Sequence, residues 1–163
     1  MGTGKSAVGR LIADHLRFGF VDTDDLIEKR AGKSISRLFE EDGETVFRHH
    51  ERQVVEELNH SKGVVIATGG GLGANETNLA SLKQHAFVVC LWASPQIIWN
   101  RVRTQTHRPL LQTANPLGKI QELLAVREPF YRQADILVNT EVRSPKEVAL
   151  QVSHEFHFVT RPK

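Results

Sequence analysis

The sequence predicts an α/β fold in which a parallel sheet lies between layers of helices. Short apolar runs of strand length alternate with longer stretches of helical periodicity, which is the pattern of strand–helix–strand units. The clearest run is continuously apolar, as expected for a strand that helices bury on both faces. With 163 residues, 40% of them hydrophobic, the chain has the size of one domain, so we expect a single domain over residues 1–163.

The chain opens with what matches the second half of a phosphate-binding loop. In the full pattern, G-x-x-x-x-G-K-[ST], backbone N–H groups surround phosphates, the Lys contacts them and the hydroxyl binds Mg²⁺. Gly4, Lys5 and Ser6 fit the last three positions. The first glycine and the strand that should precede it do not occur in the sequence. A plain helix N-terminus with a solvated lysine is therefore the alternative.

A helix after Lys5 strengthens the prediction of an anion site, because a helix directs the positive end of its dipole at an anion in such a loop. One mostly apolar face of this helix is predicted to carry Val8, Leu11, Ile12, His15 and Leu16.

The remaining elements follow from periodicity and from capping signals. We predict strands at 19–21, 64–67, 87–92 and 135–138. We predict helices from about residue 26, at 34–39, 43–59, 95–103 and 119–132, and after Ser144, which opens a capping box with Glu147. Residues 104–118 lack periodicity and contain prolines, so we expect a surface excursion or lid there.

Composition narrows the class of protein. The net charge of +2 is nearly balanced and gives no broad basic surface for nucleic acid. The single cysteine, Cys90, lies in an apolar run and is expected to be a buried core thiol. With no signal peptide and no membrane-length apolar stretch, we expect a cytoplasmic protein that binds neither nucleic acid nor membranes and acts as a monomer.

Polar clusters follow three predicted strands, at the edge where parallel sheets bind ligands. They are Asp22-Thr23-Asp24, Thr68-Gly69-Gly70-Gly71, and Ser94. Ordinary turn and N-cap chemistry is the alternative for the two aspartates. Three glycines after a buried strand suggest that a ligand approaches the backbone closely, although a tight turn would also use them.

Three arginines away from these clusters are further candidates. Arg48 lies one helical turn before Glu51, Arg108 lies in the excursion, and Arg127 lies one turn before Tyr131. Each has a simpler interpretation, a surface ion pair for Arg48 and a solvated side chain for the other two.

Taken together, the motifs Gly-Thr-Gly-Lys-Ser, Asp-Thr-Asp, Phe-Arg-His-His-Glu, Thr-Gly-Gly-Gly, Arg-Pro-Leu-Leu and Arg-Glu-Pro-Phe-Tyr occur in an order that resembles the shikimate kinases, from Met1 to about His154. The resemblance implies a three-layer P-loop kinase fold. In that fold the strand order is 2-3-1-4-5, and this chain lacks the first, central strand. We therefore expect a gap in the sheet and weak activity of the chain as it stands.

The resemblance also implies a reaction, the transfer of the γ-phosphate of ATP to the 3-hydroxyl of shikimate. Arg48 and Arg127 would bind the shikimate carboxylate, Asp24 would accept from the ring hydroxyls and act in catalysis, and Gly70 and Gly71 would offer N–H groups. Catalysis would further depend on Lys5 and Arg108.

On the nucleotide side, the resemblance implies that ATP lies on residues 2–7 and that Mg²⁺ lies near Ser6 and Asp22. The residues expected to bind ATP are Gly2, Thr3, Gly4, Lys5, Ser6, Ala7, Arg108 and, near adenine, Arg143. Another small-molecule P-loop kinase, such as a gluconate kinase, is one alternative. An inactive truncated relative that only binds a ligand or partner is the other.

Overall fold

The computed structural model describes residues 2–104 and 109–160. The strands are β1 (Gly19–Asp22), β2 (Val64–Ala67), β3 (Val89–Trp92) and β4 (Ile136–Asn139). The helices are α1 (Lys5–Leu16), α2 (Thr23–Ala31), α3 (Ile35–Glu41), α4 (Gly43–Leu58), α5 (Glu76–Lys83), α6 (Pro95–Val102), α7 (Pro116–Tyr131) and α8 (Pro145–Thr160), with short 3-10 helices η1 (Leu72–Ala74) and η2 (Pro109–Leu111). The predicted alternation of strands and helices is confirmed.

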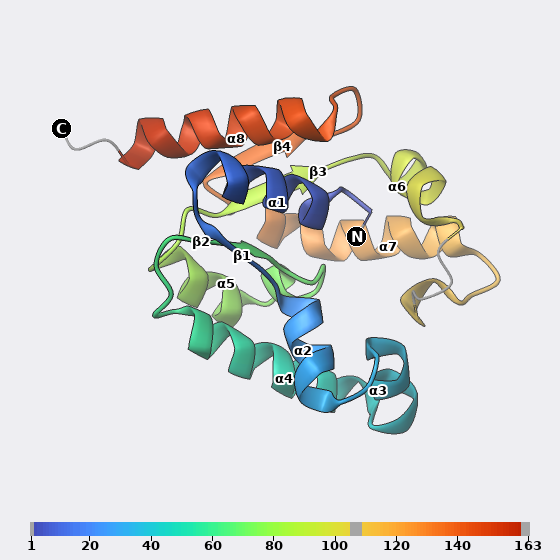
Figure 1. The fold of residues 1–163 in the computed structure, drawn as a ribbon. Helices are drawn as coiled ribbons and strands as arrows, with labels where there is room; N and C mark the ends of the chain where they lie inside the picture. Colours follow the sequence, from blue (N-terminus) through green and yellow to red (C-terminus); the bar gives the residue numbers. More distant parts are fainter. Residues whose placement is uncertain (1, 105–108, 161–163) are drawn as a thin grey trace.

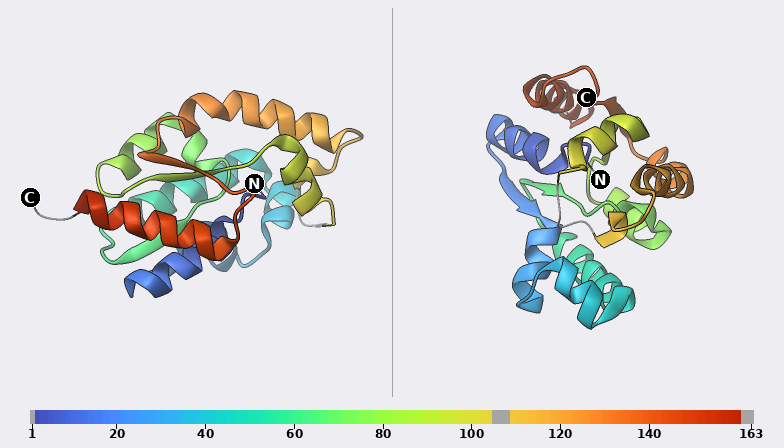
Figure 2. Two further views of the ribbon diagram at one scale, coloured as in Figure 1. Left: turned by 90° about the horizontal axis from the view of Figure 1, so that it is seen from above. Right: turned by 90° about the vertical axis from the view of Figure 1, so that its right-hand side faces the viewer.

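Helices cover the strands from both sides (Figure 1). In that view α8 lies above the strands, while α4 and α5 lie below them. The view from above shows α1 and α8 side by side (Figure 2). Val8 and Ile12 of α1 pack there against Val148 and Val152 of α8, with strand residues beneath. His15, which the periodicity also placed on the apolar face of α1, is exposed.

The parallel sheet is divided into two pairs of strands. β1 pairs with β2, from Gly19 opposite Val64 to Asp22 opposite Ala67, and β3 pairs with β4, from Val89 opposite Ile136 to Trp92 opposite Asn139. Over residues 2–104 and 109–160, no strand joins the two pairs. The expected absence of the central strand is thus confirmed.

A single hydrophobic cluster nevertheless connects the two pairs. Val65 of β2 and Leu91 of β3 both pack against the cluster that contains Val8 of α1 and Val138 of β4. Apolar burial of this kind contributes roughly 25 cal/mol per Å² and needs no hydrogen bonds between strands. The apolar cluster beneath α1 therefore holds together the two pairs of strands, which no strand joins in the described residues.

Capping explains where several helices begin, and it corrects two predicted boundaries. The Asp22 carboxylate accepts from the Asp24 N–H, so α2 begins at Thr23 rather than near residue 26. The Asn115 side chain accepts from the Gly118 N–H, so α7 begins at Pro116 and takes the last residues of the predicted lid. The predicted capping box of Ser144 and Glu147 is formed as expected.

Helix α5 was not predicted, and its eight residues carry little apolar periodicity. Its N-cap, Asn75, accepts from the Asn78 N–H and supplies the start signal. In the part of the chain that the structure describes, no helix has the length and apolar character needed to span a bilayer.

The divided sheet gives a prediction about stability. About ten residues would be added before Met1, as an apolar strand that ends in glycine. This strand should pair with the unpaired edges of β2 and β3 and satisfy their N–H and C=O groups. Because each kcal/mol shifts the melting temperature of a domain of this size by about 2–4 °C, we expect a rise of about 5 °C or more. Thermal melting measured by circular dichroism checks this. An extension of equal length made of glycine and serine is the control, and an equal rise with it would contradict strand pairing.

Candidate functional site

A cavity of about 870 Å³ lies at the carboxyl ends of the strands. Its lining includes loop residues that follow β1, β2 and β4, together with the N-terminal loop and residues of α4 and α7. Of the predicted site residues, the lining contains Gly2, Thr3, Gly4, Lys5, Ser6, Ala7, Asp22, Asp24, Arg48, Gly70, Gly71, Arg127 and Arg143. Ser94 is not among them, and its N–H donates instead to the Glu141 carboxylate at 2.6 Å.

The N-terminal loop delivers the start of α1 to this cavity. Gly4 is the N-cap of α1 with φ 89°, a left-handed conformation that glycine adopts without the strain of a side chain. Its carbonyl accepts from the Val8 N–H at 2.9 Å, so the helix starts directly after the loop. The first N–H groups of α1 have no partner within the helix and are available to an anion at its N-terminus.

The side chains of Ser6 and Asp22 are hydrogen-bonded to each other beside the N-terminal loop. The Ser6 hydroxyl donates to Asp22 Oδ2 at 2.6 Å, and Asp22 Oδ1 accepts from the Asp24 N–H at 3.1 Å. A hydroxyl and a carboxylate are oxygen ligands of the kind that Mg²⁺ takes alongside waters and phosphates. The described residues contain no cluster of three His, Cys, Asp or Glu that could bind a metal by themselves. The arrangement suits a metal ion that arrives with a phosphate ligand.

The glycine loop after β2 lies against the side chains around it. The Gly69 N–H donates to Thr23 Oγ1 at 3.0 Å, which ties the loop to the start of α2. A methyl group on Gly69 would lie 2.6 Å from Asp24 Oδ1, and one on Gly71 would clash with a nitrogen of the Arg48 guanidinium. In the structure the groups that approach these glycines closely are side chains of the protein, and the predicted approach of a ligand stays a prediction.

Arg48 is held by two carboxylates of its own helix. It donates to Glu44 at 2.7 Å and to Glu51 at 2.6 Å. The predicted pairing with Glu51 is present, but its interpretation as a surface ion pair is wrong, because only 2% of Glu51 is exposed. Burial raises the pKa of the Glu51 carboxyl above its usual value, while the Arg48 guanidinium opposes this shift.

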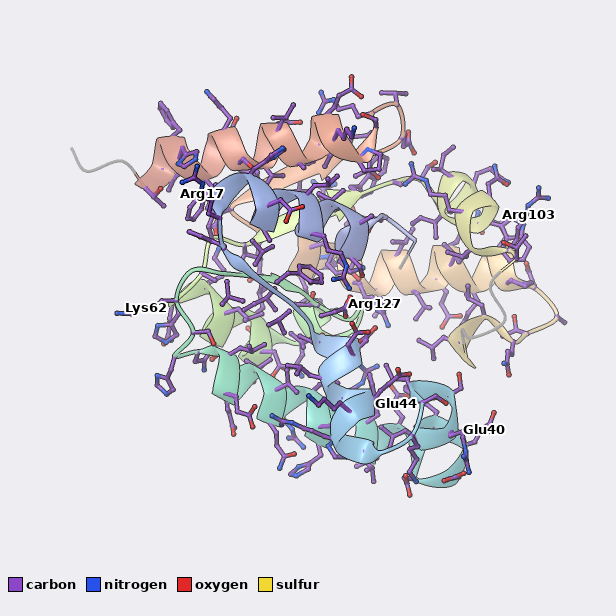
Figure 3. The ribbon with its side chains drawn as sticks, in the orientation of Figure 1. Arg17, Glu40, Glu44, Lys62, Arg103 and Arg127 are labelled. Carbon is purple, nitrogen blue, oxygen red and sulfur yellow. The ribbon has the colours of Figure 1, made fainter. Side chains whose placement is uncertain are left out.

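Arg127 is buried, but its Nη1 donates to a backbone carbonyl and not to a carboxylate. It is 9% exposed, and its Nη1 donates to the Gly70 carbonyl at 3.1 Å. No carboxylate of the described residues forms an ion pair with it. In Figure 3, Arg127 lies in the interior of the molecule, whereas Arg103 lies at its edge. A buried guanidinium whose partner is a neutral carbonyl is costly, and an anion beside it would offset that cost.

The structure also brings in residues that the sequence did not single out. Arg101 of α6 donates to the Thr140 carbonyl at 2.6 Å and, at 3.5 Å, to the Gly2 carbonyl, so it braces the N-terminal loop. Tyr131 donates to the Gly70 carbonyl at 2.7 Å. These contacts join residues between 39 and 99 positions apart, and none of them has a local signal in the sequence.

Two predicted features are placed only in part. Arg143 lines the cavity and its guanidinium donates to Gln151 of α8. Arg108 lies outside the described residues, as does the middle of the predicted lid. Leu110 and Leu111 of η2, on the far side of that segment, line the cavity.

Comparisons with known proteins identify relatives of this chain. The family model for shikimate kinase matches residues 1–157. The shikimate kinase of Thermodesulfovibrio yellowstonii is 42% identical over 163 residues, which cover all of this chain and 94% of that protein. The structure of a shikimate kinase from Acinetobacter baumannii in complex with shikimate matches with a TM-score of 0.94 at 36% identity, over 99% of this chain and 91% of that one. A gluconokinase from Sinorhizobium meliloti matches less well, with a TM-score of 0.56 at 18% identity.

The tie between Thr23 and the glycine loop gives a second prediction. Replacing Thr23 by valine keeps the shape of this buried side chain but leaves the Gly69 N–H without its acceptor. We expect a loss of about 1–3 kcal/mol, measured by urea unfolding. Thr77→Val, at an exposed position of α5, is the matched control. A loss of equal size in both variants would show that the buried hydrogen bond is not the cause.

Proposed function

The chain belongs to the shikimate kinase family, and we propose that it transfers the γ-phosphate of ATP to the 3-hydroxyl group of shikimate. The products are shikimate 3-phosphate and ADP. The observation that carries the proposal is the cavity itself, in which a phosphate loop faces a buried arginine that has no carboxylate partner in the described residues. The cavity therefore suits two anionic ligands, a nucleotide and a carboxylate.

At the acceptor end, Arg127 and Arg48 bind the shikimate carboxylate. A guanidinium matches a carboxylate with two parallel hydrogen bonds, which are stronger than neutral ones. Arg48 is already paired with Glu44 and Glu51, so its position is fixed before the substrate arrives. Arg127 should contribute more of the binding free energy, because the acceptor of its Nη1 hydrogen bond is a neutral carbonyl and no described carboxylate forms an ion pair with it.

Asp24 binds the ring hydroxyls and orients the attacking oxygen. Its backbone N–H is held by the Asp22 cap, and its carboxylate lies beside Gly69 in the lining of the cavity. A carboxylate in contact with a hydroxyl can take its proton as the bond to phosphorus forms. The N–H groups of Gly70 and Gly71 face the same substrate.

At the nucleotide end, the loop of residues 2–7 surrounds the phosphates and Lys5 contacts them. Ser6 and Asp22 would hold Mg²⁺, which would neutralise charge on the phosphates. Arg143 would lie near adenine, and Arg108 would close over the site from the lid. A monomer that acts in the cytoplasm stays a prediction from the sequence.

This division of roles agrees with the chemistry. Phosphoryl transfer needs the two reacting oxygens in line and the charge on the transferred group neutralised, and it asks for little covalent chemistry from the protein. The walls of the cavity hold donor and acceptor together, so the enzyme works mainly by positioning.

The test is ADP release from ATP in the presence of shikimate, with gluconate as the alternative acceptor. With shikimate as the acceptor, we expect ADP release and a product that has the mass of shikimate 3-phosphate. With gluconate as the acceptor, we expect neither. ADP release with gluconate but not with shikimate would overturn the proposal in favour of another small-molecule kinase. The same assay is run on the chain itself and on the chain extended by the added strand. If neither of them releases ADP with either acceptor, the protein is better described as an inactive relative.

The unequal pairing of the two arginines gives a prediction. Arg127→Ala should raise the KM for shikimate by roughly 100-fold and Arg48→Ala by roughly tenfold, the range expected for one charge-assisted contact. The KM for ATP should stay within about twofold in both, which steady-state kinetics measures. A larger effect of Arg48→Ala, or a parallel rise in the KM for ATP, would contradict the assigned roles.

Asp24→Asn tests the acceptor. The amide keeps the size of the side chain and can still hydrogen-bond, but it cannot accept a proton. We expect kcat to fall by about 100-fold or more, while shikimate still binds within about tenfold of the original affinity. Asp14→Asn, at an exposed position of α1 outside the cavity lining, is the control and should leave kcat unchanged. Wild-type turnover of Asp24→Asn would remove Asp24 from the mechanism.

A further inference from the structure

One wall of the cavity is formed by α3, which lies beside α2 and α4 (Figure 1). Ile35, Ser36 and Phe39 of this helix line the cavity. The centroid of the Phe39 ring lies 4.8 Å from that of Phe47 of α4, and Cζ of Arg48 lies 5.2 Å from the centroid of the same Phe47 ring. A series of ring contacts therefore connects α3 to an arginine that the proposed function assigns to the acceptor.

The start of α3 is held by a side chain of the preceding helix. Glu28 of α2 accepts with Oε1 from the Ile35 N–H at 2.8 Å, in a partly buried position. This N–H is the first of α3, and the first N–H groups of a helix have no acceptor within the helix itself. The N-cap, Ser34, accepts from a different donor, the Arg37 N–H, at 3.4 Å. Glu28 thus satisfies a donor that α3 cannot satisfy by itself.

The turns on either side of α3 are open. Gly32 precedes this helix and Gly43 follows it, with φ of 66° and 83°, and a methyl group at either position would meet open space. Lys33 donates to Glu41 and Asp42 at the far end of α3. These two hydrogen bonds close the segment on itself and do not attach it to α2.

Apolar packing attaches α3 to α2 in a less specific way. Leu38 of α3 lies in the same buried cluster as Ile27 of α2. Such packing holds two helices together, but the hydrophobic effect has no direction. The hydrogen bond from Ile35 to Glu28 has both a direction and a narrow range of length, so it fixes where α3 begins relative to α2.

We propose that Glu28 is a positioning residue for the acceptor, which holds the Ile35 N–H and thereby keeps the α3 wall in place beside Arg48. This inference rests on the proposed function, since it needs an acceptor bound next to Arg48. Glu28 acts on the acceptor half of the cavity, because α3 packs against α2 and α4, whereas the phosphate loop leads into α1.

The first test compares two substitutions of Glu28 in the full chain. Glu28→Ala removes the acceptor of the Ile35 N–H, and Glu28→Gln keeps an oxygen in its place. The control is Glu40→Ala, at an exposed position of α3 outside the cavity lining and at the edge of the molecule (Figure 3). Steady-state kinetics gives KM for shikimate, KM for ATP and kcat. Amide hydrogen exchange of residues 35–42 in the free protein reports on α3 directly.

We expect Glu28→Ala to raise the KM for shikimate about tenfold and to speed amide exchange in α3. The KM for ATP and kcat at saturating shikimate should stay within about twofold. Glu28→Gln should recover both the KM for shikimate and the slow exchange, and Glu40→Ala should change neither. If Glu28→Ala leaves the KM for shikimate unchanged, or raises the KM for ATP in parallel, Glu28 does not position the acceptor and the inference is overturned.

The second test separates positioning from direct contact, because Glu28 itself lines the cavity. Ile35→Pro removes the N–H to which Glu28 binds, and proline suits the first position of a helix. The preceding residue, Ser34, has φ −65° and ψ 155°, which a following proline allows. Glu28→Ala is therefore measured in the original chain and in Ile35→Pro as a double-mutant cycle.

We expect the tenfold effect of Glu28→Ala to fall below about twofold in the Ile35→Pro background. An effect of the same size in both backgrounds would show that Glu28 touches the acceptor itself, and that result overturns the inference while the proposed function stands. If the original chain neither binds nor phosphorylates shikimate, the proposed function falls, and this role falls with it.

Discussion

The site depends on a stretch of backbone that carries no side chains of its own. Residues 69–71 lie where α2, α4 and α7 converge, and each helix contributes a side chain that touches the loop. Thr23 accepts from Gly69, Arg48 lies against Gly71, and Arg127 donates to Gly70. A side chain larger than hydrogen at Gly69 or Gly71 would occupy the space in which these groups meet. The glycines thus set the distances between charged groups that come from distant parts of the chain.

The two arginines show how the surroundings of a residue change what it can do. Arg48 is neutralised by Glu44 and Glu51 and fixed in place, which costs little entropy on binding but leaves less charge for a ligand. Arg127 is buried, forms no ion pair among the described residues, and donates to a neutral carbonyl. In the proposed function Arg48 would therefore contribute mainly orientation and Arg127 mainly binding energy.

Local signals were enough to predict part of this structure. The strand at 64–67 was predicted to the residue because its four apolar residues end at Thr68, and the start of α8 followed from the capping box at Ser144. The P-loop, the aspartates and the glycine loop were found because each is a contiguous motif. The burial of Glu51 and the contact of Tyr131 with Gly70 depend on packing between distant segments, and no local pattern reports them. Helix α5 was not predicted from the sequence, because its apolar face is weak and its cap is a single asparagine.

The packing of α1 against α8 has a consequence for synthesis of the protein. The helix that follows the phosphate loop is made well before α8, the helix that covers its apolar face. Until Val148 and Val152 are made, Val8 and Ile12 have no helical partner on that side. Such high sequence separation slows folding, because the chain loses loop entropy before the contact forms. In a partly folded chain in which α8 has not yet docked, this face of α1 lacks its helical cover and is an apolar surface open to non-native contacts.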